Sequence, residues 1–321
     1  MPRVRLLPAS KYLATMKYAY ADYEAKDFRY PFYCSFKVLQ RCDSRCEFCN
    51  VWRSPAPDMP TEKVLRVIDN VAKSSVVLLS IEGGEPLLRS DIGEILEHAR
   101  TKPLYLLFTT SGKLFDRRPM KEYAKLIDFL HVSIDEGHKN LDLYERLPEF
   151  ASWGPIVCVQ IVVTREHLPD LESKIKECYD AGAKAVVMPA CHLPGTDDFL
   201  PDTRAFRNEV FRLKQRYPST IITTDKYLRT LDAPHGCNAA SVIIDSDARL
   251  YYPCRTLMEK SIDASEEPLM GFIGTEKARE CREKMKACDV NCHWYQYFAT
   301  DSFLSIRSGI SALKPYFADM L

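Results

Sequence analysis

The sequence lacks three features that would place a protein in a special class. No apolar run among its 321 residues approaches the length that spans a bilayer, and no low-complexity segment interrupts it. The 44 lysines and arginines balance the 44 aspartates and glutamates, so bulk charge gives no reason to expect nucleic acid as a partner. The basic N-terminus is not followed by a long hydrophobic region or a small-residue cleavage site, so we expect no secretory signal.

Cysteine is abundant, with 12 residues in a chain that is 46% hydrophobic. Such a chain is long enough to bury a sizeable core and does not need disulfides to fold. A reducing cytoplasm is the compartment that these features favour. Clustered cysteines in that compartment usually indicate metal binding or catalysis.

Short apolar runs alternate with amphipathic stretches from residue 32 to about residue 190. This alternation predicts a parallel sheet with right-handed helical crossovers. Six such units suit either a partial barrel or an open doubly wound sheet, and periodicity does not choose between them. The apolar runs are Phe32–Leu39, Val76–Ile81, Leu104–Thr110, Phe129–Ile134, Ile156–Val163 and Ala185–Met188.

The pattern changes at both ends of this α/β region. Residues 10–27 are typical of a helical arm, and Ser241–Ile244 with Arg249–Tyr252 predict a β-hairpin. A charged helix near 275–287 follows the hairpin. We therefore expect an arm (1–31), an α/β unit (32–230), a small cysteine-rich module (231–300) and a tail (301–321).

The first group of cysteines has the spacing C-x3-C-x2-C, at Cys42, Cys46 and Cys49. Three thiolates on one loop can hold three irons of a [4Fe–4S] cluster and leave the fourth without a protein ligand. An open coordination position is what a reactive metal site needs. The alternatives are a zinc knuckle without its fourth ligand and three incidental thiols.

This loop resembles that of the radical S-adenosylmethionine (SAM) superfamily, including an aromatic residue, Phe48, just before the last cysteine. A second likeness follows the second apolar run, where the family binds the SAM amino group through glycine-rich backbone that a ligand can approach closely. The residues of that segment are Glu82, Gly83, Gly84, Glu85 and Pro86.

Further likenesses lie at the ends of later strands. In the family, polar side chains at positions such as Thr110, Ser111, Ser133 and Asp135 reach the SAM methionine and ribose. The positions where relatives line the adenine are Val162, Val163 and Thr164. The alternative explanations are ordinary helix capping and a core strand.

The resemblance implies a partial (β/α)6 barrel over roughly residues 32–190, with its site at the carboxyl ends of the strands. It also implies reductive cleavage of SAM to a 5′-deoxyadenosyl radical that abstracts hydrogen from an unactivated carbon. A reductant such as flavodoxin or ferredoxin would supply the electron.

The second group of cysteines comprises Cys237, Cys254, Cys288 and Cys292. Four thiolates from separate loops can close a [4Fe–4S] cluster or a zinc site, and buried free thiols are a further alternative. The arrangement resembles the twitch domain, a shortened SPASM domain, which implies two [4Fe–4S] clusters in all. Cys281 could replace one of the pair.

Two residues of the sequence are candidates for contact with the substrate. Arg255 and His192 are candidates for orienting it or acting as a base, and oxidation or C–C bond formation on a small or lipid-linked polar molecule is the expected chemistry. The tyrosines and lysines of the arm leave peripheral membrane contact open. A peptide-modifying maturase of the same superfamily and a non-catalytic iron–sulfur or zinc protein are the alternatives.

Overall fold

The computed structural model describes residues 5–53, 56–190, 199–231, 236–290, 292–300, 302 and 306–317. The candidate residue His192 lies outside them. Among the described helices, none combines the length and the apolar character that crossing a bilayer requires.

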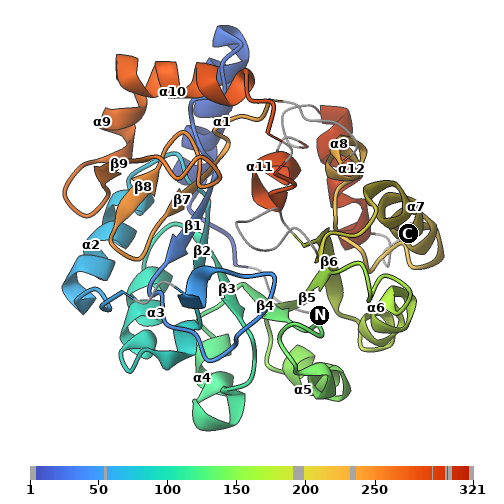
Figure 1. Cartoon of the computed structure of the whole chain (residues 1–321). Coiled ribbons are helices and arrows are strands. Elements are labelled where there is room, and N and C mark those ends of the chain that lie inside the picture. The colour runs from blue at the N-terminus through green and yellow to red at the C-terminus, as the bar shows by residue number, and fades with distance from the viewer. Residues whose placement is uncertain are drawn as a thin grey trace.

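A single sheet, nine-stranded within the described residues, forms the centre of the fold (Figure 1). Its first six strands are parallel and lie side by side in chain order, so the direction of winding never reverses. A doubly wound sheet would reverse at a switch point. The partial-barrel alternative is therefore confirmed, with strands β1 (Tyr33–Lys37), β2 (Leu78–Glu82), β3 (Tyr105–Thr110), β4 (Phe129–Ser133), β5 (Ile156–Val163) and β6 (Lys184–Pro189).

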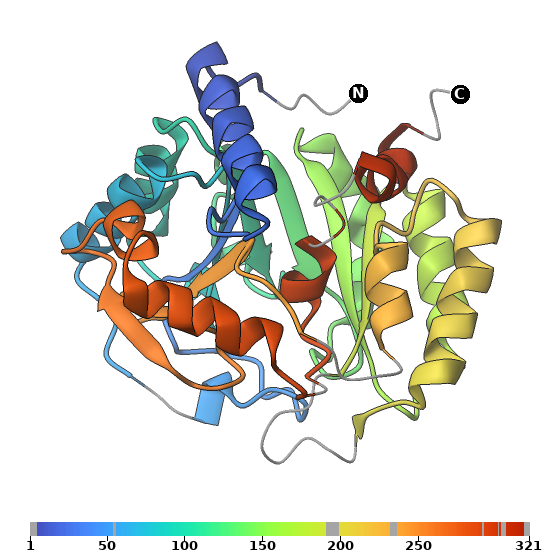
Figure 2. The ribbon, with the colours of Figure 1, turned by 90° about the horizontal axis from the view of Figure 1, so that it is seen from above.

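Amphipathic helices cover the outer face of these strands (Figures 1 and 2). In the first of them the buried residues Val64, Val67, Ile68 and Val71 recur every three or four positions, which places them on one face against the sheet. The helices are α2 (Thr61–Ala72), α3 (Ile92–Arg100), α4 (Met120–Ala124), α5 (Leu147–Ser152), α6 (Leu171–Asp180) and α7 (Thr203–Arg216). Short 3₁₀ helices span Val51–Arg53, Pro86–Leu88, Phe115–Arg117 and Leu141–Arg146.

The predicted hairpin is present, but it continues the barrel sheet. Strand β7 (Ser241–Ile244) pairs in parallel with β1, and β8 (Arg249–Tyr251) and β9 (Lys260–Asp263) add to it antiparallel. The boundary expected at residue 231 therefore precedes strands that belong to the same sheet. The three boundaries between the four expected segments remain predictions.

One of the remaining helices closes the open side of the barrel. Helix α11 (Tyr295–Ala299) packs between β7 and α8 (Asp225–Thr230), and so spans the gap between the two sides of the curved sheet (Figures 1 and 2). The others are α1 (Ala9–Ala25), α9 (Leu269–Ile273), α10 (Glu276–Lys286) and α12 (Ile306–Phe317).

Candidate active site

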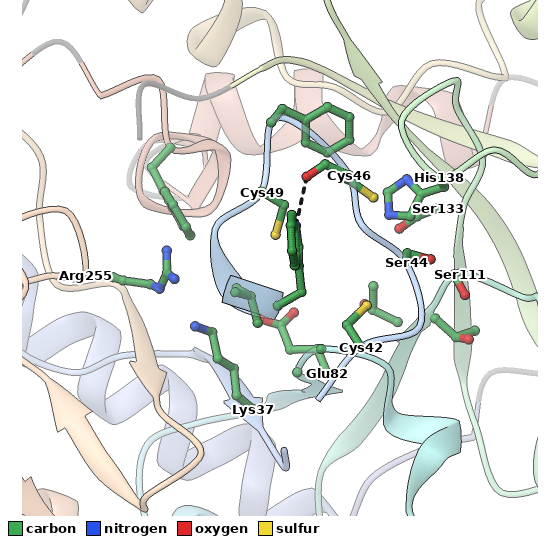
Figure 3. A pocket seen from close by; sticks show the side chains of 18 residues that line it. Lys37, Cys42, Ser44, Cys46, Cys49, Glu82, Ser111, Ser133, His138 and Arg255 are labelled. Atoms are coloured by element: carbon green, nitrogen blue, oxygen red, sulfur yellow. Dashed lines mark hydrogen bonds between the residues drawn. The ribbon is translucent and has the colours of Figure 1, made fainter. Parts of the chain in front are cut away.

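The loop after β1 turns three thiols into one cavity of about 230 Å³ (Figure 3). The Cys49 N–H donates to the Cys46 carbonyl oxygen at 3.1 Å, and the Trp52 indole N–H donates to the same oxygen at 3.1 Å. These bonds hold a tight turn that places Cys42, Cys46 and Cys49 around the cavity. The structure therefore brings together all three cysteines of the C-x3-C-x2-C spacing.

The environment of these thiols favours the protonated form. Burial raises the pKa of Cys42 to about 11 and also raises the pKa of Cys46, and nearby carboxylates and thiolates add to both shifts. A metal must therefore displace protons when it binds, because the thiolate is the ligand. Soft sulfur donors facing one space fit an iron–sulfur cluster.

The glycine pair after β2 packs against the backbone of the cysteine loop. The Gly84 N–H donates to the Leu39 carbonyl at 3.0 Å, and the Glu85 N–H donates to the Arg41 carbonyl at 2.8 Å. A Cβ at Gly83 would lie 2.5 Å from the Leu39 oxygen, and one at Gly84 would lie 2.0 Å from the Arg41 oxygen. Both positions therefore require glycine for contact between two loops, and both line the cavity.

Replacing Gly84 by alanine should displace the cysteine loop. The clash is with backbone, which has no flexible side chain to move, so we expect a loss of about 3 kcal/mol or more in the free energy of unfolding. Urea unfolding measures this loss. Gly271→Ala is the control, because its Cβ would meet nothing within 4 Å. Equal stability of both variants would contradict the packing role.

Glu85 connects the ends of two strands. Its buried carboxylate accepts hydrogen bonds from the Leu87 N–H at 3.0 Å and from the Thr110 hydroxyl, the Ser111 N–H and the Ser111 hydroxyl, each at 2.8 Å. Burial raises its pKa although these bonds favour the charged form. Thr110 and Ser111 line the cavity, whereas Glu85 and the buried Pro86 are not among the lining residues. Their predicted contacts with SAM remain predictions.

The end of β4 contributes a histidine that the sequence did not single out. Asp135 is fully buried, and its carboxylate lies 2.8 Å from the Nδ1 atom of His138 and accepts from the Val162 N–H at 3.2 Å. His138 and Ser133 line the cavity, but Asp135 does not. The spacing D-x-x-H after the fourth strand was the available signal. Asp135 thus orients a lining residue.

Strand β5 carries Val162 and Val163, two of the residues predicted to line the adenine. Val163 is buried in the main core, whereas Val162 lines a second cavity within the barrel. Phe48 lines both cavities, and a Cβ on Gly137 would lie 2.1 Å from its ring. The structure therefore places Phe48 at the junction of the two spaces. The predicted adenine contact of Val163 remains untested.

The second group of cysteines gathers beside the end of α10. The N–H groups of Cys237 and Cys288 both donate to the Met285 carbonyl, at 3.1 and 3.3 Å. Burial raises the pKa of Cys254 and of Cys292, and Cys288 lies near enough to add to both shifts. The structure thus brings four cysteines from three chain segments to one place.

Cys281 is directed elsewhere. It lies inside α10, and its thiol faces the Tyr252 carbonyl at 3.9 Å. Burial raises its pKa, and the charged neighbours with the largest effects are Lys284 and Glu259.

Within the described part of the chain, no three His, Cys, Asp or Glu side chains are gathered tightly enough to hold one metal ion.

Arg255 lines the first cavity together with Lys37, the last residue of β1. Burial, followed by the charge of Arg255, lowers the pKa of Lys37 to about 8, against the opposing effects of Asp245 and Glu82. The sequence did not single out Lys37, because a lysine at a strand end is ordinary until its surroundings are known.

Two kinds of comparison relate this chain to known proteins. The family profile described as the radical SAM superfamily matches residues 36–198, about half of the chain. A PqqA peptide cyclase from Granulibacter bethesdensis is 29% identical over 104 residues, which are 31% of this chain and 28% of the relative. A GTP 3′,8-cyclase from Lactiplantibacillus plantarum is 32% identical over 153 residues, 44% of this chain and 45% of the relative. The matched segments thus span less than half of either relative.

Solved structures share the fold. SuiB of Streptococcus suis bound to S-adenosylmethionine has a TM-score of 0.68 at 15% identity, over 83% of this chain and 71% of SuiB. The protein anSMEcpe, with bound AdoMet and a Cp18Cys peptide, has a TM-score of 0.63 at 15% identity, over 90% of this chain and 98% of that one. The family profile covers half of the sequence, and the relatives of this chain are named as cyclases. The chain therefore belongs to the radical SAM superfamily and is an enzyme.

Proposed function

We propose that Cys42, Cys46 and Cys49 hold the [4Fe–4S] cluster that superfamily membership implies, and that SAM binds beside Gly83 and Gly84. The carrying observation is that these three thiols and the glycine backbone line one cavity (Figure 3). When bound, the cluster and SAM supply a 5′-deoxyadenosyl radical for hydrogen abstraction. The chain's residues position that chemistry and exclude water from it.

The second cysteine group is proposed to hold an auxiliary cluster, as in a twitch-like domain. Its four thiolates would close the coordination of the cluster, so it would carry electrons rather than bind substrate. A single zinc would need every thiolate about 2.3 Å from one point. A four-iron cluster binds each thiolate through a different iron and suits cysteines that stand further apart.

The second cavity supports a substrate with an apolar part. It measures about 430 Å³, within the range of ligand sites, and meets the first cavity at Phe48, Cys49, Glu82 and Trp294. Leu78 and Glu82 both line it, so it follows the length of β2, roughly 13 Å at the usual rise per residue.

The lining of this cavity is nearly free of charge. Burial lowers the pKa of His131 to about 3, so this side chain is neutral at pH 7. Glu82 is then the one charged group among the described lining residues. Most of the lining is apolar, which suits a hydrocarbon, and uncharged polar groups such as Gln160, Thr224 and Gln296 could bind a polar part of the same molecule. We therefore propose oxidation or C–C bond formation on a small or lipid-linked polar substrate.

Peptide modification is the second candidate. The relatives named as PqqA peptide cyclases and the SuiB structure bound to its precursor peptide SuiA favour it. A small precursor peptide encoded beside the gene would support this candidate. The non-catalytic alternative is not retained, because the superfamily assignment identifies an enzyme.

Anaerobic reconstitution with iron and sulfide tests the proposed function. We expect about eight irons per chain, from two four-iron clusters, and release of 5′-deoxyadenosine from SAM that depends on dithionite. Flavodoxin or ferredoxin would replace dithionite in the cell. A fully loaded protein that releases no deoxyadenosine would overturn the proposal.

Helix α1 supports peripheral contact with a membrane, which is also part of the proposal. Leu13, Met16, Tyr20 and Tyr23 follow a three-to-four-residue spacing and are exposed, whereas Lys11 of the same helix is buried. The Lys11 ammonium donates to the Ser74 carbonyl at 3.0 Å. The helix thus turns polar residues inward and an apolar stripe outward, flanked by the exposed Lys17 and Lys26.

Removing two residues of this stripe should weaken vesicle binding. Each apolar side chain that enters the interface contributes about 1.5 kcal/mol or more, so Leu13→Ser with Met16→Ser should lower binding at least about tenfold. Co-sedimentation with phosphatidylglycerol vesicles measures the binding of the protein to the membrane surface. Tyr179→Ser, at an exposed residue of α6, is the control. Unchanged sedimentation of the double variant would exclude this surface.

A further inference from the structure

Two buried cations share the wall of the first cavity. Lys37 and Arg255 are each only 5% exposed, and both line the cavity. Figure 3 shows their charged ends side by side, on the side of Cys49 and Glu82. They come from distant parts of the chain, since Lys37 ends β1 and Arg255 follows the auxiliary residue Cys254.

Each cation keeps hydrogen-bonding capacity that the described residues do not fill. The Lys37 ammonium has no hydrogen-bond partner among the described residues, and its nearest carboxylate oxygen, on Asp245, is 3.6 Å away. Asp245 also lies 2.7 Å from the Lys260 ammonium and accepts from the Tyr251 hydroxyl at 2.7 Å. The carboxylate is therefore shared between two lysines.

Arg255 is held in place but keeps donors free. Its guanidinium stacks over the Trp294 ring at 5.0 Å and donates one long bond of 3.5 Å to the Asn50 side chain. Its Nε–H has no partner within the described residues. Glu82, the other acid of this wall, already accepts bonds from the hydroxyls of Ser35 and Ser80.

Buried charges normally have close counterions, because leaving water is costly and like charges repel. A planar guanidinium beside a compact ammonium is a combination that recognises oxyanions, since one supplies a fork of N–H donors and the other a point charge. Both side chains line the cavity in which the radical would form. This arrangement is best explained by an anion that enters with a ligand.

We propose that Lys37 and Arg255 form a subsite for an oxyanion of the substrate, a carboxylate or a phosphate. The proposal rests on the proposed function for the identity of the neighbouring cluster and SAM. The subsite needs both β1 and the segment after β8, so it exists only when the C-terminal segment is packed on the barrel. It anchors the substrate between the two groups of cysteines.

The test uses the reconstituted holoenzyme with saturating SAM and no reductant. Inorganic phosphate and acetate are titrated separately by calorimetry, and the tighter of the two identifies the oxyanion. We expect one anion per chain and an at least tenfold weaker affinity in both Lys37→Met and Arg255→Gln. Arg255→Lys, which keeps the charge, should retain part of the binding.

Two controls separate the subsite from general effects. Lys63→Met removes a lysine that also joins the barrel to the C-terminal segment, through a 2.8 Å ion pair with Asp263, and should bind the anion as the unaltered protein does. Iron content and thermal unfolding confirm that each variant is folded. SAM affinity should stay within about twofold in every variant.

Several results would overturn the subsite. Unchanged anion affinity in both variants would exclude it, and so would a tenfold loss of SAM affinity with competition between SAM and the anions, because the cations would then serve the SAM carboxylate. A holoenzyme that binds the anions through Lys37 and Arg255 but neither binds nor cleaves SAM would refute the proposed function alone.

Discussion

Alanine in place of Cys42, Cys46 or Cys49 is expected to abolish reductive cleavage of SAM, with a fall of about 10³-fold or more in 5′-deoxyadenosine release. The three thiols line one cavity, and each would hold a different iron. Two thiolates would no longer retain the cluster. Iron should fall from about eight to about four per chain, with the auxiliary site still loaded.

Cys34→Ala is the matched control for this loss. Cys34 lies on the same strand that leads into the cysteine loop, but its fully buried thiol belongs to the main core and lines neither cavity. We expect wild-type iron content and deoxyadenosine release, with a loss of about 1 kcal/mol in stability. Deoxyadenosine release at the wild-type rate in any of the three loop variants would refute the assignment of the ligands.

Removal of a thiol from the second cysteine group should lower the iron content but leave SAM cleavage nearly unchanged. Cys254→Ala and Cys288→Ala are each expected to lose about four irons and to retain SAM cleavage within a few-fold, because the first cavity is built from other residues. Substrate oxidation should be lost, since the electron from the substrate radical would have no acceptor. Iron analysis and electron paramagnetic resonance of the reduced protein measure the effect.

Cys281→Ala decides whether the neighbouring cysteine is a ligand. Its thiol faces the Tyr252 carbonyl rather than the other cysteines, so this variant should keep all of its iron. The auxiliary assignment would be wrong if Cys281→Ala lost four irons while Cys288→Ala kept them. Zinc without sulfide in the purified protein would also contradict it.

The core of the site could be anticipated because its signals are local. The spacing of Cys42, Cys46 and Cys49 places three thiols on one loop, whatever the rest of the chain does. The sequence predicts that Gly84 allows a ligand to approach closely. In the structure, a Cβ at this position would clash with the Arg41 carbonyl. That contact joins two loops of the site, and sequence alone does not show which atoms approach each other.

The sequence did not show which of the two valines predicted at the adenine faces inward. Val162 faces the inner cavity and Val163 the core, and a shift of one residue in a strand exchanges the two faces. The predicted contact of the Glu82–Pro86 segment with SAM remains a prediction, and the sequence did not indicate that the Glu85 carboxylate binds the end of β3. A buried polar side chain takes the donors that folding brings to it.

The amino-acid sequence alone determined the alternation of strands and helices, the cysteine loop and the second cysteine group, since periodicity and ligand spacing are properties of neighbouring residues. Only the tertiary structure decided that β7 extends the sheet beside β1, that α11 closes the barrel, and that Lys37 meets Arg255. The physical reason is that contacts between distant segments depend on sheet register and packing, which no local pattern records.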